Sequence, residues 1–260
     1  MGEVNLISVS KRFALRVEGK VQAVQALDRV SFAVREGEIV ALIGPSGCGK
    51  TTALRIAMGL ETATSGKVTV DGRDVTGCGH DRGMVFQFAE LLPWLTALQN
   101  VMFGLEMKGM RGAPLRETAT RYLELVGLGV SLSRRPHQLS GGMKQRVGIA
   151  RALAIDPQVL LMDEPFGALD AQTRETLQAE LLDIHNRTRK TILFVTHDLD
   201  EAVLLADRIV VLKEGRVQEV MDVPIARPRP DLGLVRGLPE FAATRYRIWQ
   251  ALHASGGALH

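Results

Sequence analysis

The chain has 260 residues, 46% of them hydrophobic and 23% charged, and its net charge is +3. This composition is typical of a globular protein, and the length fits one large α/β domain with room for an inserted subdomain. The balance of 32 basic and 29 acidic residues gives no reason to expect a nucleic-acid partner.

No segment approaches the ~18 uninterrupted apolar residues of a membrane helix, and the N-terminal residues lack the pattern of a signal peptide. We therefore expect a protein of the cytosol, or one that a partner holds on the cytoplasmic side of a membrane. In that reducing compartment Cys48 and Cys78 are expected to be free thiols.

The first ninety residues mix strand and helix patterns. In chain order they predict strands at 3–7 and 27–34 on either side of a loop, a buried strand at 38–43, a helix at 50–60, and strands at 68–70 and 84–86. Gly59 is expected to end the helix, and Asp71-Gly72 to form a turn.

Residues 89 to 155 differ, because their apolar spacing is helical, with breaks at Gly109, Gly112, Gly127 and Pro136. The segment 113–126 places one apolar face on a helix that Gly127 would end, formed by Leu115, Ala119, Tyr122, Leu123 and Val126. This block is expected to be a helical insertion.

In the rest of the chain, strand patterns again alternate with helix patterns. They predict a buried strand at 159–162, a helix at 171–187 with Leu177, Leu181 and Ile184 inside, strands at 192–195 and 209–212, and a short helix near 241–252. Strands that alternate with helices predict a largely parallel sheet.

A glycine-rich segment follows the strand at 38–43 and opens the next helix. It fits the pattern G-x-x-x-x-G-K-[ST] and consists of Gly44, Pro45, Ser46, Gly47, Cys48, Gly49, Lys50 and Thr51. Backbone amides of such a loop cradle phosphates, the lysine reaches the β- and γ-phosphates, and the Thr51 hydroxyl ligates Mg²⁺. Thr52 is either a further phosphate donor or a residue that only caps the helix.

Two carboxylates, Asp163 and Glu164, emerge at the end of the apolar strand 159–162. Ligands of α/β proteins bind at this end of the strands. Asp163 would hold Mg²⁺ and Glu164 would orient an attacking water. Alone, the pair would indicate only a solvated strand end. Paired with a phosphate loop, it predicts nucleotide hydrolysis.

A second helix start carries Ser140, Gly141 and Gly142 before a stripe of apolar residues. The simpler interpretation is a serine cap followed by a glycine turn. The same residues also form an anion site at a helix N-terminus. One chain would then carry two phosphate-binding devices, which is reasonable if the second serves the nucleotide of another copy.

These segments resemble the motifs of ABC ATPases over roughly residues 4 to 220. LSGGMKQR is similar to the family's signature motif, GPSGCGKT to its Walker A motif, and VLLMDE to its Walker B motif. Met143 stands where glutamine is commonest. The resemblance implies a phosphate-loop NTPase core (residues 4–235) with a mostly parallel sheet, an N-terminal antiparallel β region, an inserted helical subdomain at about 89–155 and a helical tail at 236–260.

The resemblance also implies roles for four more residues. Gln87 matches the glutamine that touches Mg²⁺ and leads to the helical subdomain, and Asp170 matches a residue that crosses the dimer interface. His197 matches the switch histidine on the γ-phosphate, although alone it would be an ordinary histidine near a strand end. Phe13 matches the aromatic that stacks on adenine, or else is a core phenylalanine.

The branch of the family is suggested by residues 91–101 and by the tail from Arg227 to Trp249, which resemble ATPases of nitrate, sulfonate and taurine importers. Trp94 would be either an aromatic of the core or of a crevice, or part of an exposed surface that receives a partner. The expected partners are a second copy, a membrane permease and, indirectly, a solute-binding protein, with ATP and Mg²⁺ as cofactors. The alternatives are a two-component exporter ATPase, a soluble ABC protein outside transport and a regulatory module without turnover.

Overall fold

The computed structural model describes residues 2–17 and 20–253. Its backbone divides into two units, the first made of Met1–Cys78 with Thr191–His260 and the second of Gly79–Lys190. Among the described residues, no helix is both long enough and apolar enough to cross a bilayer.

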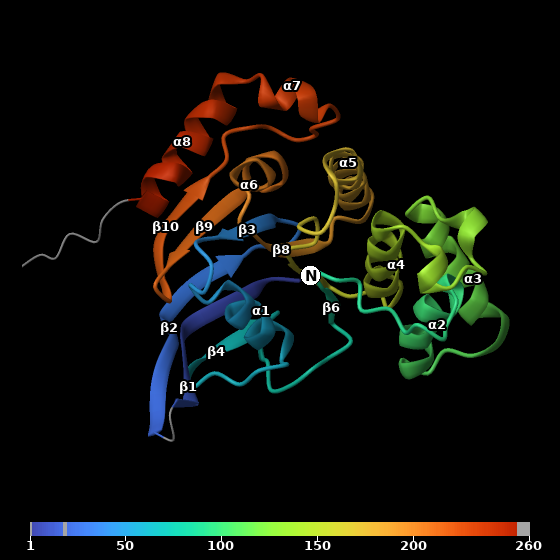
Figure 1. Ribbon diagram of the computed structural model, residues 1–260, viewed down its shortest axis with the longest axis horizontal. Helices are drawn as coiled ribbons and strands as arrows, with labels where there is room; N and C mark the ends of the chain where they lie inside the picture. Colours follow the sequence, from blue (N-terminus) through green and yellow to red (C-terminus); the bar gives the residue numbers. More distant parts are fainter. Residues whose placement is uncertain (1, 18–19, 254–260) are drawn as a thin grey trace, which may run out of the picture. The chain divides into compact units, whose positions relative to one another are not determined.

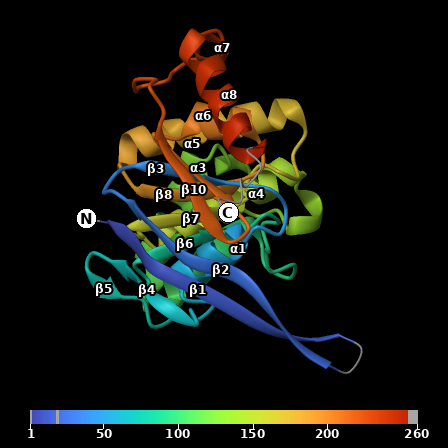
Figure 2. The same ribbon diagram turned by 90° about the vertical axis from the view of Figure 1, so that its left-hand side faces the viewer.

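An antiparallel sheet begins the first unit. Its strands are β1 (Val4–Val17), β2 (Lys20–Val34), β4 (Ser65–Val70) and β5 (Arg73–Asp74), in the order β2-β1-β4-β5. Figure 2 shows β1 and β2 side by side as a long hairpin. The antiparallel β region is confirmed, as are the strand at 68–70 and the turn after it.

The loop expected between residues 7 and 27 was wrong. Both strands continue toward the hairpin tip, where residues 18 and 19 lie outside the described chain. Phe13 lies opposite Val24, and the Arg12 guanidinium donates to the Gln25 side chain at 2.6 Å. The sequence of these segments does not alternate regularly between apolar and polar residues, so the pattern that predicts a strand is absent there.

Four further strands of the first unit are β3 (Ile39–Ile43), β8 (Thr191–Thr196), β9 (Arg208–Lys213) and β10 (Arg216–Asp222), in the order β10-β9-β3-β8. The central strand β3 is buried throughout and pairs in parallel with β8 and β9. The edge strand β10 is antiparallel and was not predicted, because charged and apolar residues alternate irregularly along it.

The helices of the first unit are α1 (Lys50–Met58), α6 (Leu199–Leu205), α7 (Leu232–Arg236) and α8 (Pro239–His253). α1 ends before Gly59, and α8 includes the residues of the short C-terminal helix that the sequence predicts. α6 and α7 were missed because seven and five residues are too few for a periodic signal. Figure 1 shows α7 and α8 beside α6, and contacts join α6 to both.

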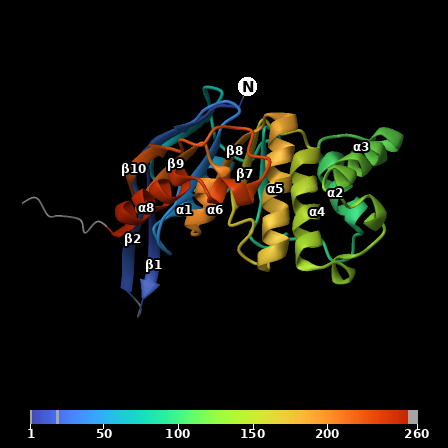
Figure 3. The same cartoon turned by 90° about the horizontal axis from the view of Figure 1, so that it is seen from above.

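The second unit contains a parallel strand pair and four α-helices. The strands are β6 (Arg82–Val85) and β7 (Val159–Asp163), and the helices are α2 (Ala97–Met107), α3 (Gly112–Leu125), α4 (Gly141–Ala154) and α5 (Ala171–Thr188). Two 3-10 turns, Gly129–Ser131 and Pro136–Gln138, lie between α3 and α4. Figure 3 shows α4 and α5 running side by side.

The apolar face predicted for α3 is confirmed. Leu115, Ala119 and Leu123 are buried, and α2, α3 and α4 contact one another around them. The strand expected at 84–86 begins earlier and ends one residue sooner, since Phe86 already belongs to the segment that leaves β6. Helices in the middle of the chain therefore form a small core of their own.

Candidate functional site

The phosphate-loop segment lies where the sequence places it: residues 44–49 connect β3 to α1, and Lys50 and Thr51 begin α1. Gly49 has a φ of 104°, a region that L side chains rarely adopt. A Cβ at this position would also lie 2.4 Å from the carbonyl oxygen of Ala26 in β2. Only glycine satisfies both requirements. The loop conformation is therefore set by its own backbone at Gly49 and by the close approach of β2.

The loop brings a cation to the N-terminus of α1. The Lys50 side chain is buried, and its ammonium donates to the carbonyl oxygens of Gly44 at 2.7 Å and Pro45 at 3.0 Å. No side chain caps this helix end, and Thr51 and Thr52 lie half-buried in its first turn. Helix amides, a lysine and two hydroxyls are thus gathered where a phosphate chain can bind.

Cys48 gives this loop a testable reactivity. Its thiol is buried, and burial raises its pKa, although the charge of Lys50 opposes the shift. Because the thiolate is the reactive form, we expect maleimide to inactivate ATP hydrolysis slowly at pH 7. The rate should rise by up to about tenfold per pH unit as the thiolate fraction grows, and bound nucleotide should protect the enzyme.

The control for this experiment is Cys48→Ser, assayed in parallel over the same pH range. The exposed Cys78 should be labelled first, without loss of activity. Inactivation that persists in Cys48→Ser would place the sensitive group elsewhere.

Two other predicted residues lie in the first unit. His197 is exposed directly after β8, and the next residue, Asp198, caps α6. Phe13 is half-buried in the hairpin, with the Lys11 ammonium 4.9 Å from its ring centroid. The interpretation of Phe13 as a core residue is therefore wrong, and its contact with adenine stays a prediction.

In the second unit the structure brings Glu164 and Gln87 together. Asp163 ends β7 and Glu164 follows it with a φ of 44°, in the left-handed region where non-glycine residues are uncommon. The Gln87 amide donates to Oε2 of Glu164 at 3.3 Å. A carboxylate that accepts and an amide that donates are thereby placed side by side, an arrangement able to orient a water molecule.

The second helix start also has the expected geometry. Ser140 is the N-cap of α4, and its hydroxyl accepts the backbone N–H of Met143 at 3.3 Å. Ser140 and Gly141 are exposed, so this helix end is accessible to an anion from outside.

Gly142 has a packing role that the sequence does not reveal. A Cβ on it would lie 2.3 Å from Cγ2 of Thr173 in α5. The backbone N–H of Thr173 in turn donates to Asp170 at 3.0 Å, and this bond, with others to the same side chain, lowers the Asp170 pKa. Gly142, predicted to touch a partner's nucleotide, thus packs against the start of α5, which Asp170 caps.

Two side chains of α4 were missed by sequence reasoning. Gln145 donates to the Phe86 carbonyl at 3.0 Å, and Arg151 donates to the carbonyls of Ala89 at 2.8 Å and Glu90 at 2.9 Å. These bonds attach α4 to the segment that carries Gln87. No local sequence pattern predicts these hydrogen bonds, because each joins residues about sixty positions apart.

A glycine-rich loop with a buried lysine, opening a helix after a buried parallel strand, defines a phosphate-loop nucleotide-binding protein. The family profile described as "ABC transporter" matches residues 27–167. The chain therefore belongs to the ABC transporter family, and it is an ATP-hydrolysing domain of that family.

Relatives agree with this assignment. The chain is 50% identical to a nitrate import ATP-binding protein of Synechocystis sp. over 207 residues, which is 79% of this chain and 78% of the relative. A bicarbonate transport ATP-binding protein of the same organism is 50% identical over 208 residues, or 78% and 74% of the two chains. A dimeric ATP-binding cassette bound to ADP and Pi has a TM-score of 0.75 at 37% identity, and the alignment covers 84% of this chain and 98% of the other.

Proposed function

We propose that this chain is the ATPase subunit of an importer that takes up a small nitrate- or sulfonate-like solute through a separate permease. The observation that carries the proposal is the pairing of two helix starts in one chain, one with a buried lysine and one exposed at Ser140. Relatives named for nitrate import and bicarbonate transport support the choice of an importer.

In the proposed working state, two copies bind two ATP molecules head to tail. Each nucleotide lies between residues 44–51 of one copy and residues 140–142 of the other, with Asp170 at the interface. A solved relative that is described as a dimer supports this arrangement. The γ-phosphate is the differential contact that holds the closed dimer, and its loss on hydrolysis opens it.

Within each site we assign one task to each polar residue. Glu164 orients the attacking water, and His197 contacts the γ-phosphate. The Thr51 hydroxyl, the Asp163 carboxylate and the Gln87 amide oxygen are hard oxygen donors of the kind that Mg²⁺ prefers. Bound Mg²⁺ would neutralise charge on the phosphates.

A groove in the second unit supports attachment to a permease. It has a volume of about 460 Å³ and is lined by Leu92, Trp94, Leu95, Gln99, Met102, Phe103 and Glu106. Trp94 is 67% exposed, so the core interpretation of this residue is wrong. An aromatic and aliphatic groove close in sequence to Gln87 suits a cytoplasmic helix of a permease, which would hold the chain at the membrane.

Substitution of Trp94 tests this attachment. Trp94→Asp places a charge in the groove but removes little buried area, so the unfolding temperature should stay within about 2 °C of wild type. Retention on permease-containing membranes and solute uptake should be lost. Val130→Asp is the matched control, because Val130 is an exposed apolar residue of the same unit outside the groove. Normal assembly and uptake by Trp94→Asp would contradict docking here.

The import function itself is tested by uptake. A strain that lacks this chain should lose ATP-dependent accumulation of the solute that the partner solute-binding protein binds, and the wild-type chain should restore it. Binding assays on that protein with nitrate, bicarbonate, taurine and alkanesulfonates would identify the solute. Unchanged uptake in the deletion strain, or co-purification with an exporter, would overturn the proposal.

A further inference from the structure

The helix that follows His197 is short and depends on outside support. α6 spans seven residues, too few to be stable alone. Its N-cap Asp198 accepts the backbone N–H groups of Asp200 and Glu201, and the Thr196 hydroxyl donates to the Glu201 carboxylate at 2.6 Å. The position of His197 is therefore tied to the first turn of this helix.

Two arginines complete the C-terminal end of α6. A helix leaves its last four carbonyl groups without helical partners. Here the Ala206 N–H donates to Ala202 at 3.0 Å. The other three carbonyls accept bonds from the C-terminal segment: Val203 and Leu204 from Arg229 at 3.1 and 2.8 Å, and Leu205 from Arg227.

Arg229 is a structural cation rather than an available binding group. It is buried, and all its hydrogen bonds here go to backbone carbonyls. Desolvation lowers its pKa to about 10, so it remains protonated at neutral pH. The segment before α7 thus fixes one end of α6.

The opposite end of α6 is held by α8. Nε of Arg245 lies 2.7 Å from Oδ1 of Asp200, a residue in the first turn of α6. Both partners are partly exposed, so solvent and other anions can reach this ion pair. Through this ion pair, a ligand that binds at the surface of α8 can affect the first turn of α6, which lies next to His197.

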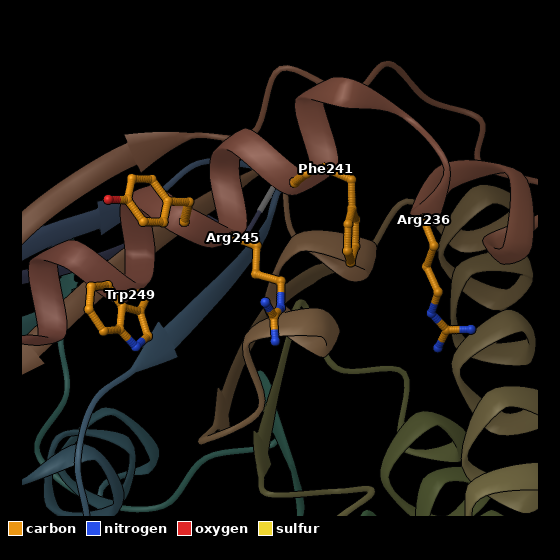
Figure 4. A pocket seen from close by; sticks show the side chains of 6 residues that line it. Arg236, Phe241, Arg245 and Trp249 are labelled. Carbon is orange, nitrogen blue, oxygen red and sulfur yellow. The ribbon is translucent and has the colours of Figure 1, made fainter.

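A cavity of about 550 Å³ lies at this point, lined by Arg236, Phe241, Ala242, Arg245, Tyr246 and Trp249. Figure 4 shows the side chains of Arg245 and Phe241 next to each other, with Arg236 beyond Phe241 and Trp249 on the other side. The Tyr246 and Trp249 rings stack with centroids 6.0 Å apart, and both residues are partly exposed.

The lining determines the chemistry of an occupant. Its charged members are two arginines, and the lining residues include no carboxylate. A guanidinium binds carboxylate, sulfonate or phosphate groups in its plane, as Arg245 already binds Asp200. The aromatic side chains favour a flat apolar body, and the volume is in the range of small-molecule sites.

We propose that this cavity binds a small aromatic anion, a ring that bears a carboxylate, sulfonate or phosphate group, and that its binding slows ATP hydrolysis. The anion competes with Asp200 for Arg245, which loosens the first turn of α6 and with it the placement of His197. The binding step is independent of the proposed function, whereas the kinetic step rests on the role proposed for His197.

Calorimetric titration tests the binding step. The chain is first saturated with ADP, so that the phosphate loop is filled and cannot bind the probe. Benzenesulfonate should bind, whereas benzyl alcohol, which lacks the charge, and methanesulfonate, which lacks the ring, should bind at least about tenfold more weakly. Arg245→Gln should raise the Kd for benzenesulfonate by about tenfold or more, and Arg245→Lys by less, because lysine keeps the charge but loses the planar fork.

The control is Arg247→Gln. Arg247 lies on the same helix and pairs with Glu219 at 2.8 Å, but it does not line the cavity. This variant should bind benzenesulfonate like wild type. Absence of binding to wild type, or equal binding by wild type, Arg245→Gln and Arg245→Lys, would overturn the site.

The kinetic step is tested by the ATPase rate of the full chain. Saturating benzenesulfonate should lower kcat by about fivefold without changing KM for ATP. Asp200→Asn should bind the probe more tightly, because no carboxylate competes for Arg245, and its kcat should no longer respond. A change in KM alone would indicate competition at the nucleotide site, and inhibition that persists in Asp200→Asn would refute this route.

Discussion

Glu164→Gln should reduce kcat for ATP hydrolysis by about 100-fold or more, which corresponds to about 2.7 kcal/mol of transition-state stabilisation. The reason is that glutamine keeps the size of the side chain and its contact with Gln87 but removes the carboxylate that would orient water. KM for ATP should change by less than about threefold, since the phosphate loop is untouched. The closed dimer should then accumulate when ATP is added.

Gel filtration with and without ATP would detect this accumulation, and steady-state kinetics would give kcat. Glu117→Gln is the matched control, because it makes the same chemical change on the exposed surface of α3. It should hydrolyse ATP like wild type. Near-normal turnover by purified Glu164→Gln would remove Glu164 from the catalytic role.

The second prediction with a large expected effect concerns an active site that two copies of the chain share. Ser140→Arg places bulk and charge at the exposed start of α4, where the partner's phosphates would approach. The homodimer should bind ATP through Lys50 but fail to close and lose at least about tenfold in turnover. Ser140→Ala serves as a control for the lost helix cap alone, which costs about 1 kcal/mol of stability.

Two mixed dimers, isolated with different affinity tags, distinguish catalysis between copies from catalysis within one chain. In the first, one chain carries Lys50→Ala and the other Ser140→Arg. If sites are shared between copies, both lesions fall in one site and the other site is intact, so up to about half the turnover should remain.

In the second mixed dimer, one chain carries both changes and the other is wild type. Shared sites would each contain one lesion, and turnover should be lost. Catalysis within one chain predicts the reverse, an active second dimer and an inactive first one. That reverse result would refute the proposed head-to-tail arrangement.

The family and the chemistry of the local motifs could be predicted from the amino-acid sequence. A phosphate loop is contiguous, and its glycines and lysine act on the backbone and helix next to them, so eight consecutive residues carry the signal. The apolar runs of β3 and β7 and the apolar face of α3 were predicted for the same reason, because burial imposes a local period.

Tertiary structure alone decided features that join distant residues. Gly142 is needed because Thr173 of another helix packs against it, and Gln145 and Arg151 act on carbonyls about sixty positions away. Nothing in the neighbourhood of these residues records such contacts, since hydrogen bonds to backbone carbonyls impose no pattern on the acceptor's sequence.

In the C-terminal segment, too, some features could be predicted from the sequence and others depend on the folded structure. The sequence predicted a short helix in the tail, but not that Arg229 would be buried against the end of α6. A seven-residue helix has too little periodicity to be predicted and too few internal bonds to stand alone. Its existence depends on side chains supplied from elsewhere in the chain, and only the folded structure brings them to it.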